Sequence, residues 1–131
     1  MRLQAEIPNL IDINQTGFIK ERAISDTFVF AMELVQVCHK RRMSAIVLKL
    51  DFAKAFDTVN WDGLQRVLRA RGFPEKWLMW ISSILNSALT AVLVNGCACP
   101  WIQCKRGLRQ GDPLSPYLFL LVAETLQRLI R

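Results

Sequence analysis

The run AIVLKLD at residues 45–51 constrains the fold of this chain more than any other segment. It is short, aliphatic and in part β-branched, which is typical of a strand buried on both faces. It ends on a carboxylate, Asp51. A carboxylate at the end of a buried strand has to be hydrogen-bonded, paired or metal-bound, because an unpaired buried charge is very costly. The segment therefore predicts a strand and a candidate site at its end.

Helical patterns flank this predicted strand. Residues 7–20 read as a loop, and apolar residues recur at helical spacing over residues 23–40. Asn60 or Thr58 can cap a helix that ends near Gly72, and Pro74 suits the first turn of another. Ser115 followed by proline predicts a last helix that runs to the end of the chain.

A hairpin is predicted between the last two helices. Residues 90–94 lead into Asn95-Gly96, the strongest short hairpin signal, and Pro100 demotes part of the returning strand to an edge or a bulge. Helices combined with a buried strand and a hairpin indicate an α+β fold, with helices packed on a small antiparallel sheet. No repeat or linker divides the chain, so residues 1–131 are expected to form one domain or part of one.

Composition excludes several classes of protein. With 52% hydrophobic and 21% charged residues, the chain is too apolar for a disordered segment, and a packed core is expected. No apolar run approaches the roughly 20 residues of a membrane-spanning helix, and the first residues lack the apolar stretch of a signal peptide. We therefore expect a soluble, intracellular protein without a membrane partner.

Seventeen basic and 11 acidic residues give a net charge of +6. The basic residues form three clusters: Lys40, Arg41 and Arg42; Arg66, Arg69 and Arg71; and Lys105, Arg106 and Arg109. Two clusters on one concave face would bind a polyanion through its phosphates. The alternative for the first two clusters is a solvated helix face.

The four cysteines, Cys38, Cys97, Cys99 and Cys104, do not show the paired spacing of a zinc site, and His39 is the only histidine. Free thiols in a reducing compartment are the better interpretation.

Three segments can carry chemistry. Asp51 could hold a divalent cation together with nucleotide phosphates, or simply form a salt bridge with Lys54. For Asp57, a helix cap or a salt bridge is the expected role. In residues 105–116, two glycines and three cations precede a helix N-terminus, a setting that suits either an anion site or an ordinary capped turn. Lys20 and Arg22 could reach phosphate oxygens from the loop around Gly17, or be exposed loop cations.

Together and in this order, these segments resemble the reverse transcriptases of non-LTR, LINE-type retroelements, plant elements in particular. NQTGFIKERAISD at residues 14–26 resembles their early fingers motif. LKLDFAKAFDTVNW at residues 48–61 is similar to motif A, and GLRQGDPLSPYLF at residues 107–119 is similar to motif B. The sequence VNG at residues 94–96 resembles the hairpin before motif B. The resemblance covers nearly the whole chain and implies a partial right-hand polymerase of fingers and palm.

The resemblance also implies roles for single residues. Asp51 would be the catalytic aspartate that binds two magnesium ions, helped by the backbone carbonyl of Phe52. Phe56 would be the aromatic steric gate that selects deoxynucleoside triphosphates. Gln110 and Gly111 would border the incoming nucleotide, and Lys20 and Arg22 would lie over its triphosphate. Lys105, Arg106 and Arg109 would contact the RNA template and DNA primer through their backbones.

One departure from the family pattern is large. Such enzymes carry an aromatic-x-Asp-Asp turn that completes the metal site, and this sequence has no Asp-Asp pair. We expect the chain to stop in the helix after motif B, without that turn or the thumb. On that basis it is predicted to be inactive as a polymerase alone, and to expose apolar surface with poor solubility.

Three hypotheses for function remain open at this point. The chain is part of an RNA-directed DNA polymerase, a non-catalytic nucleic-acid-binding remnant, or the product of a decayed element without a role. Residence in the nucleus is implied by the resemblance alone.

Overall fold

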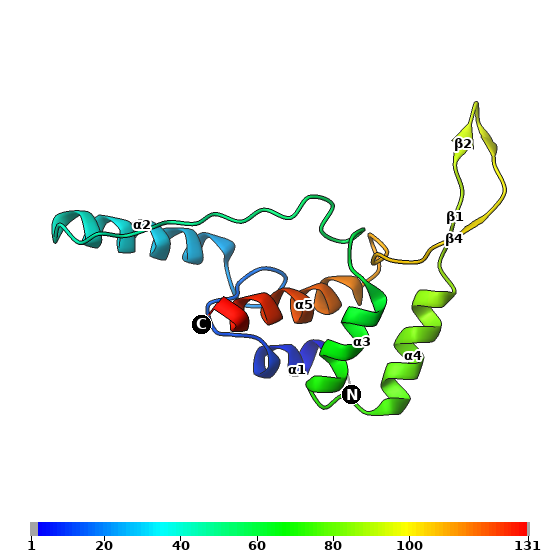
Figure 1. Ribbon diagram of the computed structural model, residues 1–131, viewed down its shortest axis with the longest axis horizontal. Coiled ribbons are helices and arrows are strands. Elements are labelled where there is room, and N and C mark those ends of the chain that lie inside the picture. The colour runs from blue at the N-terminus through cyan, green and yellow to red at the C-terminus, as the bar shows by residue number, and fades with distance from the viewer. Residues whose placement is uncertain (1–2, 131) are drawn as a thin grey trace. The chain divides into compact units, whose positions relative to one another are not determined.

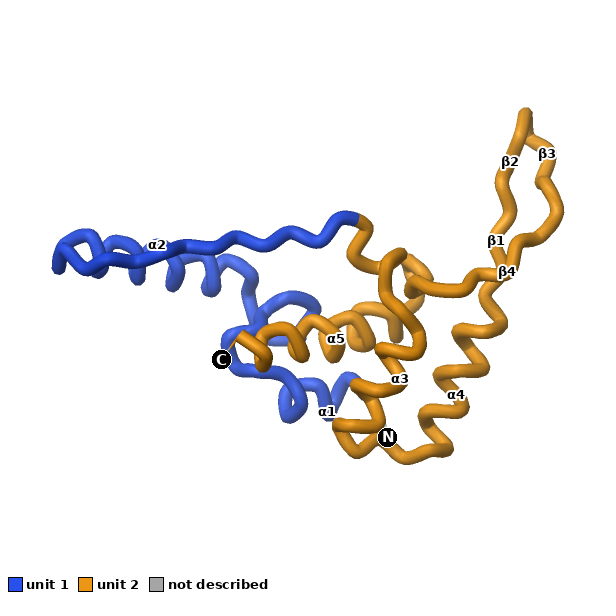
Figure 2. Tube along the Cα trace, in the orientation of Figure 1, with its two compact units in different colours: residues 1–53 blue, residues 54–131 orange. Residues whose placement is uncertain are grey.

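The computed structural model describes residues 3–130. The chain divides into two compact units, residues 1–53 and residues 54–131, which Figure 2 shows in two colours.

The first unit begins with a helix where the sequence predicted a loop. α1 spans Leu3–Leu10, so residues 7–10 are helical and the loop starts only after them. Ile7 and Ile11 are both buried, and the amide of Ile11 donates to the carbonyl of Ile7 at 3.1 Å. Apolar residues four positions apart share a helix face, and their burial outweighs the loop signal of Pro8, which lies inside the helix.

α2 spans Ile24–Lys40, as its periodicity predicts. It ends in a Schellman motif: Arg42 adopts a φ of 52°, and the amide of Met43 donates to the carbonyl of Cys38 at 2.9 Å. No residue of α2 is buried, although Phe28, Phe30 and Leu34 are large and apolar. The helical spacing is therefore correct, while the apolar residues face no core in this unit.

The predicted buried strand at residues 45–51 is wrong. The segment is extended but forms no ladder, and within residues 3–130 no backbone hydrogen bond joins it to another segment. Its side chains are exposed, with Ile46 at 98% and Leu48 at 75% of full accessibility. A β-strand forms only where a neighbouring strand is hydrogen-bonded to it. The pattern of residues along one segment does not show whether such a neighbour exists.

The second unit contains three packed helices: α3 (Trp61–Ala70), α4 (Glu75–Asn86) and α5 (Ser115–Ile130). α3 packs against both α4 and α5 (Figure 1). The side chain of Asn60 caps α3 by accepting from the amide of Gly63 at 2.7 Å, and Gly72 follows its C-terminus with a φ of 78°. The core consists of apolar side chains from all three helices: Leu64, Leu68, Leu78, Ile81, Leu85, Leu118, Leu120 and Leu121.

The predicted hairpin is confirmed and consists of two short antiparallel ladders. β1 (Leu89–Thr90) pairs with β4 (Ile102–Gln103), and β2 (Leu93–Val94) pairs with β3 (Cys97–Ala98). Asn95 and Gly96 form the turn with φ angles of 50° and 81°. Residues 91–92 lie between the ladders on one side and residues 99–101 on the other. The extra residue makes a bulge next to Pro100, as the sequence predicts.

Residues 3–130 thus combine five helices with two small antiparallel ladders. This confirms the α+β class. None of the helices among these residues is long and apolar enough to cross a membrane.

Candidate functional site

The site in the second unit starts from a tight turn before α3. Lys54 has a φ of 51°, and its carbonyl accepts from both the amide and the hydroxyl of Thr58, at 3.1 and 3.2 Å. This turn presents Phe56 and Asp57, and Val59 at its end is buried.

A loop from far along the chain closes on this turn. The amide of Gly107 donates to the carbonyl of Val59 at 2.8 Å, and the amide of Leu108 donates to the carbonyl of Phe56 at 2.8 Å. The indole N–H of Trp61 donates to the carbonyl of Gly107 at 2.7 Å. We call residues 54–61 and 105–112, joined in this way, the clasp. It brings the segments that resemble motifs A and B into direct contact.

The clasp requires glycine at position 107. Its φ is 89°, and a Cβ atom there would lie 2.9 Å from the carbonyl oxygen of Asp57 and 3.1 Å from the Asp57 Cα. Both the left-handed backbone and the close approach exclude a side chain. Gly111 has almost the same φ, 88°, but a Cβ there would meet nothing within 4 Å.

The side chains of Asp57 and Gln110 meet across the clasp. The amide Nε2 of Gln110 donates to Oδ1 of Asp57 at 3.3 Å. The sequence assigned Asp57 to a helix cap or a salt bridge. That assignment is wrong, because Asn60 caps α3 and Gln110 is the partner of Asp57. This hydrogen bond orients the side-chain amide of Gln110, with Nε2 toward Asp57 and the oxygen Oε1 on the other side.

Phe56 is held by an aromatic contact. Its ring stacks on Phe119 of α5 with centroids 5.1 Å apart and planes inclined by 23°. Both side chains are half-buried. The ring of the candidate steric gate is therefore supported from the helix that follows the clasp.

Asp112 fixes the start of α5. Its carboxylate accepts from the amide of Leu114 at 2.8 Å, and its carbonyl accepts from the amide of Ser115 at 3.2 Å. The helix begins at Ser115 as predicted, and the Asp112 carboxylate orders the residue just before it. The 105–116 segment is thus an ordered turn ahead of the helix, and its three cations are exposed.

Lys105, Arg106 and Arg109 are exposed, and none forms an ion pair with the residues that the structure describes. They line or adjoin an open hollow beside the hairpin. It is bordered by Cys104 and by residues of the clasp and of β1: Asp57, Thr90, Arg106, Leu108, Arg109 and Gln110. Such a hollow, lined with unpaired cations, suits an anionic ligand.

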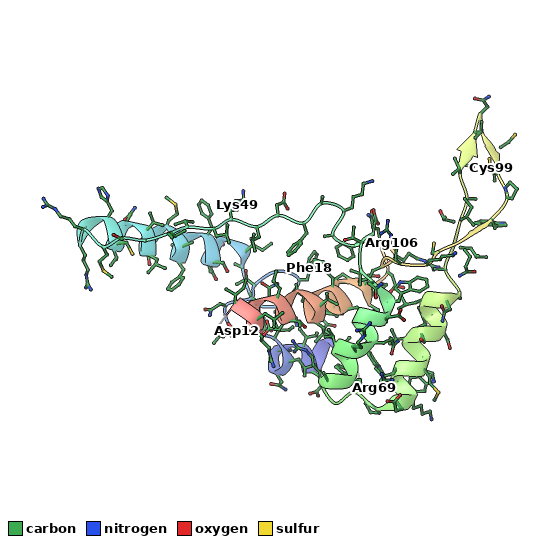
Figure 3. The ribbon with its side chains drawn as sticks, viewed as in Figure 1. Asp12, Phe18, Lys49, Arg69, Cys99 and Arg106 are labelled. Carbon is green, nitrogen blue, oxygen red and sulfur yellow. The ribbon has the colours of Figure 1, made fainter. Side chains whose placement is uncertain are left out.

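The second basic cluster does not join this one. Figure 3 labels Arg69 at one end of α3 and Arg106 in the clasp at the other end. α3 has ten residues and is therefore about 15 Å long, so Arg69 and the clasp lie at opposite ends of this helix. Arg69 donates from Nε to Oε1 of Glu75 at 2.9 Å. This hydrogen bond holds the pKa of the Glu75 carboxyl below its ordinary value and raises that of Arg69.

A third group of charges lies on α5. Glu124 is buried, and its Oε1 accepts from Nε of Arg128 at 3.2 Å. Burial lowers the pKa of Arg71 below its ordinary value, the charge of Arg128 adds to the shift, and Glu124 opposes it. These groups lie outside the clasp.

In the first unit, Asp51 and Phe52 lie in the exposed extended segment, where Phe52 is 51% accessible. No group of three or more His, Cys, Asp or Glu side chains able to hold a metal ion occurs within the described range. Asp51 is thus a suitable single ligand, but the donor set that these residues offer does not complete a metal site. The four cysteines are free thiols.

Lys20 and Arg22 lie in a loop with two left-handed residues, Phe18 and Glu21. Nη1 of Arg22 donates to the carbonyls of Asp12 and Gln15, at 2.9 and 2.6 Å, and so orders the loop. Lys20 is exposed and lies 3.8 Å from Glu21. An open hollow beside Arg22 is lined by polar and apolar side chains of the loop and α2: Ile13, Asn14, Thr16, Glu21, Asp26, Thr27 and Phe30.

Sequence reasoning missed three residues of the clasp region. Trp61 and Gly107 supply its closing contacts, and Phe119 supports Phe56. One signal was present for Trp61, because a half-buried indole N–H needs an acceptor. Nothing in the spacing of residues 56 and 119 indicates that their rings meet.

The family of reverse transcriptases (RNA-dependent DNA polymerases) matches the chain over residues 1–131. The chain belongs to this family. Together with the R2 retrotransposon relatives given next, this match confirms the resemblance to reverse transcriptases of non-LTR elements. Members of the family generally use divalent metal ions, nucleotides and a nucleic acid template.

Several of the individual relatives are retrotransposon proteins. The chain is 31% identical over 117 residues to the Pol polyprotein of the type-2 retrotransposable element R2DM of Drosophila melanogaster, covering 89% of this chain. It is 38% identical over 111 residues to the Pol polyprotein of a type-1 element R2 of Popillia japonica, covering 84% of this chain. An uncharacterized mitochondrial protein of Arabidopsis thaliana is 54% identical over 39 residues, which are 30% of this chain and 32% of that protein. The chain spans only 11% and 15% of the lengths of the two Pol polyproteins.

Proposed function

We propose that this chain supplies the part of a retroelement reverse transcriptase that receives the incoming deoxynucleoside triphosphate. The observation that carries the proposal is the clasp, in which three hydrogen bonds of 2.7–2.8 Å join residues 54–61 to residues 105–112. Family members would bind the nucleotide between these two motifs. A bound nucleotide needs rigid surroundings, because fixed groups lose little entropy when they orient it.

Within this proposal each residue has one task. Asp51 holds a divalent metal ion, which we propose is magnesium, with help from the backbone carbonyl of Phe52. Phe56 excludes a ribose 2′-hydroxyl, and Gln110 and Gly111 border the incoming nucleotide and the template base. Lys20 and Arg22 neutralise the triphosphate, while Lys105, Arg106 and Arg109 contact the backbone of the RNA template and DNA primer.

The metal ions would supply activation of the primer 3′-hydroxyl and charge neutralisation at the leaving pyrophosphate. One carboxylate cannot fix the geometry of such ions, so Asp51 needs further ligands from an aromatic-x-Asp-Asp turn. On this reading the 131 residues alone are inactive.

Primer extension tests the proposal. The assay uses an RNA template, a DNA primer, magnesium and deoxynucleoside triphosphates, with this chain beside an extended chain that continues in frame through an aromatic-x-Asp-Asp motif. We expect extension only by the extended chain, and its loss in Asp51→Ala. Asp62→Ala, which removes an exposed aspartate in the first turn of α3, is the matched control and should remain active. Extension by the short chain, or by Asp51→Ala, would contradict the proposal.

A second candidate function is nucleic-acid binding without catalysis. It is favoured by the three cations of the clasp, which are exposed and form no ion pair within residues 3–130. Each phosphate contact contributes about −0.9 to the slope of log K against log salt concentration for duplex DNA, and about −0.7 for single strands.

The salt dependence of binding by the short chain tests whether these three cations contact phosphates. Replacing Lys105, Arg106 and Arg109 with glutamine should flatten the slope by about two to three. Arg66→Gln, an exposed cation on α3, is the control. A remnant that only binds would show this salt slope, and Asp51→Ala would leave its affinity for nucleic acid unchanged. An unchanged slope in the triple variant would exclude the loop as the binding site.

A further inference from the structure

The ring of Phe56 is held from two directions. Its backbone is fixed because its carbonyl accepts from the amide of Leu108 at 2.8 Å. Its face is covered by the ring of Phe119, with centroids 5.1 Å apart and planes inclined by 23°. Because the Phe56 backbone is fixed, its side chain can move only by rotating about its own bonds, and the stacked Phe119 ring opposes that rotation.

Phe119 is itself held firmly. It lies on α5 between Leu118 and Leu120, which are 2% and 1% exposed and belong to the core of the second unit. Neighbours on both sides that are buried in the core fix the rotation of the helix about its axis. The position of the Phe119 ring therefore follows from packing on the far side of α5, and movement of the ring would disturb the core.

We propose that Phe119 is a positioning residue for sugar selection, which acts by holding the Phe56 ring against the incoming nucleotide. The inference rests on the proposed function, in which Phe56 excludes the ribose 2′-hydroxyl. A steric gate discriminates only as far as it resists displacement. A ring that can swing aside admits the larger sugar while still accepting the smaller one. Phe119 thus sets how strongly the chain rejects ribonucleotides and has little effect on deoxynucleotide addition.

The test compares kcat/KM for a deoxynucleoside triphosphate and the matching ribonucleoside triphosphate in the extended chain. Phe119→Leu should lower the discrimination ratio about three- to tenfold, which is the factor that a stacked aromatic pair contributes. The change should come from a lower KM for the ribonucleotide, with kcat for the deoxynucleotide nearly unchanged. Phe119→Tyr keeps the ring and should keep the ratio.

Phe73→Leu is the matched control. Phe73 is also half-buried and stacks on Trp77, with centroids 4.6 Å apart and planes inclined by 28°, but it lies between α3 and α4. The Phe73→Leu substitution removes the same kind of contact from the same unit and should leave the discrimination ratio unchanged. If Phe119→Leu fails to fold, Phe119→Met, which conserves volume and lacks the ring, takes its place.

A double-mutant cycle shows whether Phe119 acts through Phe56. In a Phe56→Ala background, Phe119→Leu should cause no further loss of discrimination. The inference is overturned if Phe119→Leu leaves the ratio unchanged while Phe56→Ala lowers it, or if the two losses multiply. Failure of the proposed function looks different. In that case the unsubstituted extended chain adds no deoxynucleotides, or Phe56→Ala leaves the ratio unchanged, and the inference falls with it.

Discussion

Gly107 is the residue on which the clasp depends most, because it meets two requirements at once. Its φ of 89° lies in the left-handed region, and the Asp57 backbone occupies the space that a side chain would need. Gly111 meets only the first requirement. Substituting each glycine in turn therefore separates the cost of a left-handed backbone from the cost of a steric clash with Asp57.

Gly107→Ala should lower the free energy of unfolding more than Gly111→Ala. Each substitution costs about 1–2 kcal/mol for the left-handed backbone. Gly107→Ala adds about 1–3 kcal/mol, because the new methyl group overlaps the Asp57 carbonyl. Urea denaturation of the two variants, followed by tryptophan fluorescence, measures the difference. Equal losses would show that the approach of Gly107 to Asp57 relaxes without cost.

At the scale of elements, α3 depends on its cap. Asn60 accepts from the amide of Gly63 at 2.7 Å, and one end of this helix carries the contacts of the clasp. Loss of the cap would therefore loosen the first turn of α3 and the position of Trp61 together.

Asn60→Ala should reduce the free energy of unfolding by about 0.5–2 kcal/mol, the usual contribution of a side-chain cap. Asn60→Asp keeps an acceptor oxygen and should retain most of the stability. Denaturation by urea compares the two. A loss in the aspartate variant as large as in the alanine variant would mean that the amide group, and not the acceptor, matters.

The turn between α3 and α4 carries a pH-dependent ion pair. Arg69 lowers the pKa of Glu75 from its ordinary value of 4.5, first through their hydrogen bond. A carboxyl whose pKa is depressed on folding adds stability above its unfolded pKa and loses it as the pH falls through the folded pKa. Arg69→Met should return the Glu75 pKa toward 4.5, measured by NMR titration of the carboxyl group. High salt should weaken the shift, because the pair is exposed. An unchanged pKa would contradict the pairing.

Local sequence signals predicted the helices and the hairpin of the second unit. They did not predict contacts between residues far apart in the sequence. The Asn60 cap, the Gly72 terminator and the Asn95-Gly96 turn each act within a few residues, so the sequence alone locates them. The Gln110–Asp57 bond joins residues 53 positions apart, and its partners cannot be read from spacing. The strand at residues 45–51 failed for the same reason, since pairing is a property of two segments. Candidate roles taken from resemblance, such as those of Lys20 and Gly111, stay predictions.

At the scale of the molecule, the two units differ in how their apolar residues are used. The second unit buries apolar side chains of three helices in one core. In the first unit, α2 has no buried residue, and the segment at residues 44–50 exposes Ile46, Val47 and Leu48. The expectation of exposed apolar surface is met in the first unit, and poor solubility remains a prediction.

Hydrogen exchange should distinguish the units. Amides of residues 44–52 should exchange at nearly unprotected rates, because no backbone hydrogen bond holds them within the described range, while those of α3 should be the slowest. Mass spectrometry of peptic fragments at several protein concentrations gives both rates. Protection of residues 44–52 that grows with concentration would show that a second copy pairs with them. Protection equal to that of α3 at low concentration would contradict the extended, unpaired segment.

The hairpin between α4 and the clasp has a consequence for the order of folding. Trp61 and Gly107 are 46 positions apart, which makes their direct meeting slow. Pairing of Leu89 with Gln103 removes less than a third of that separation, and the packing of α3 on α4 shortens it further. The clasp should then close after the transition state. Substitutions in it would speed unfolding and leave the folding rate almost unchanged.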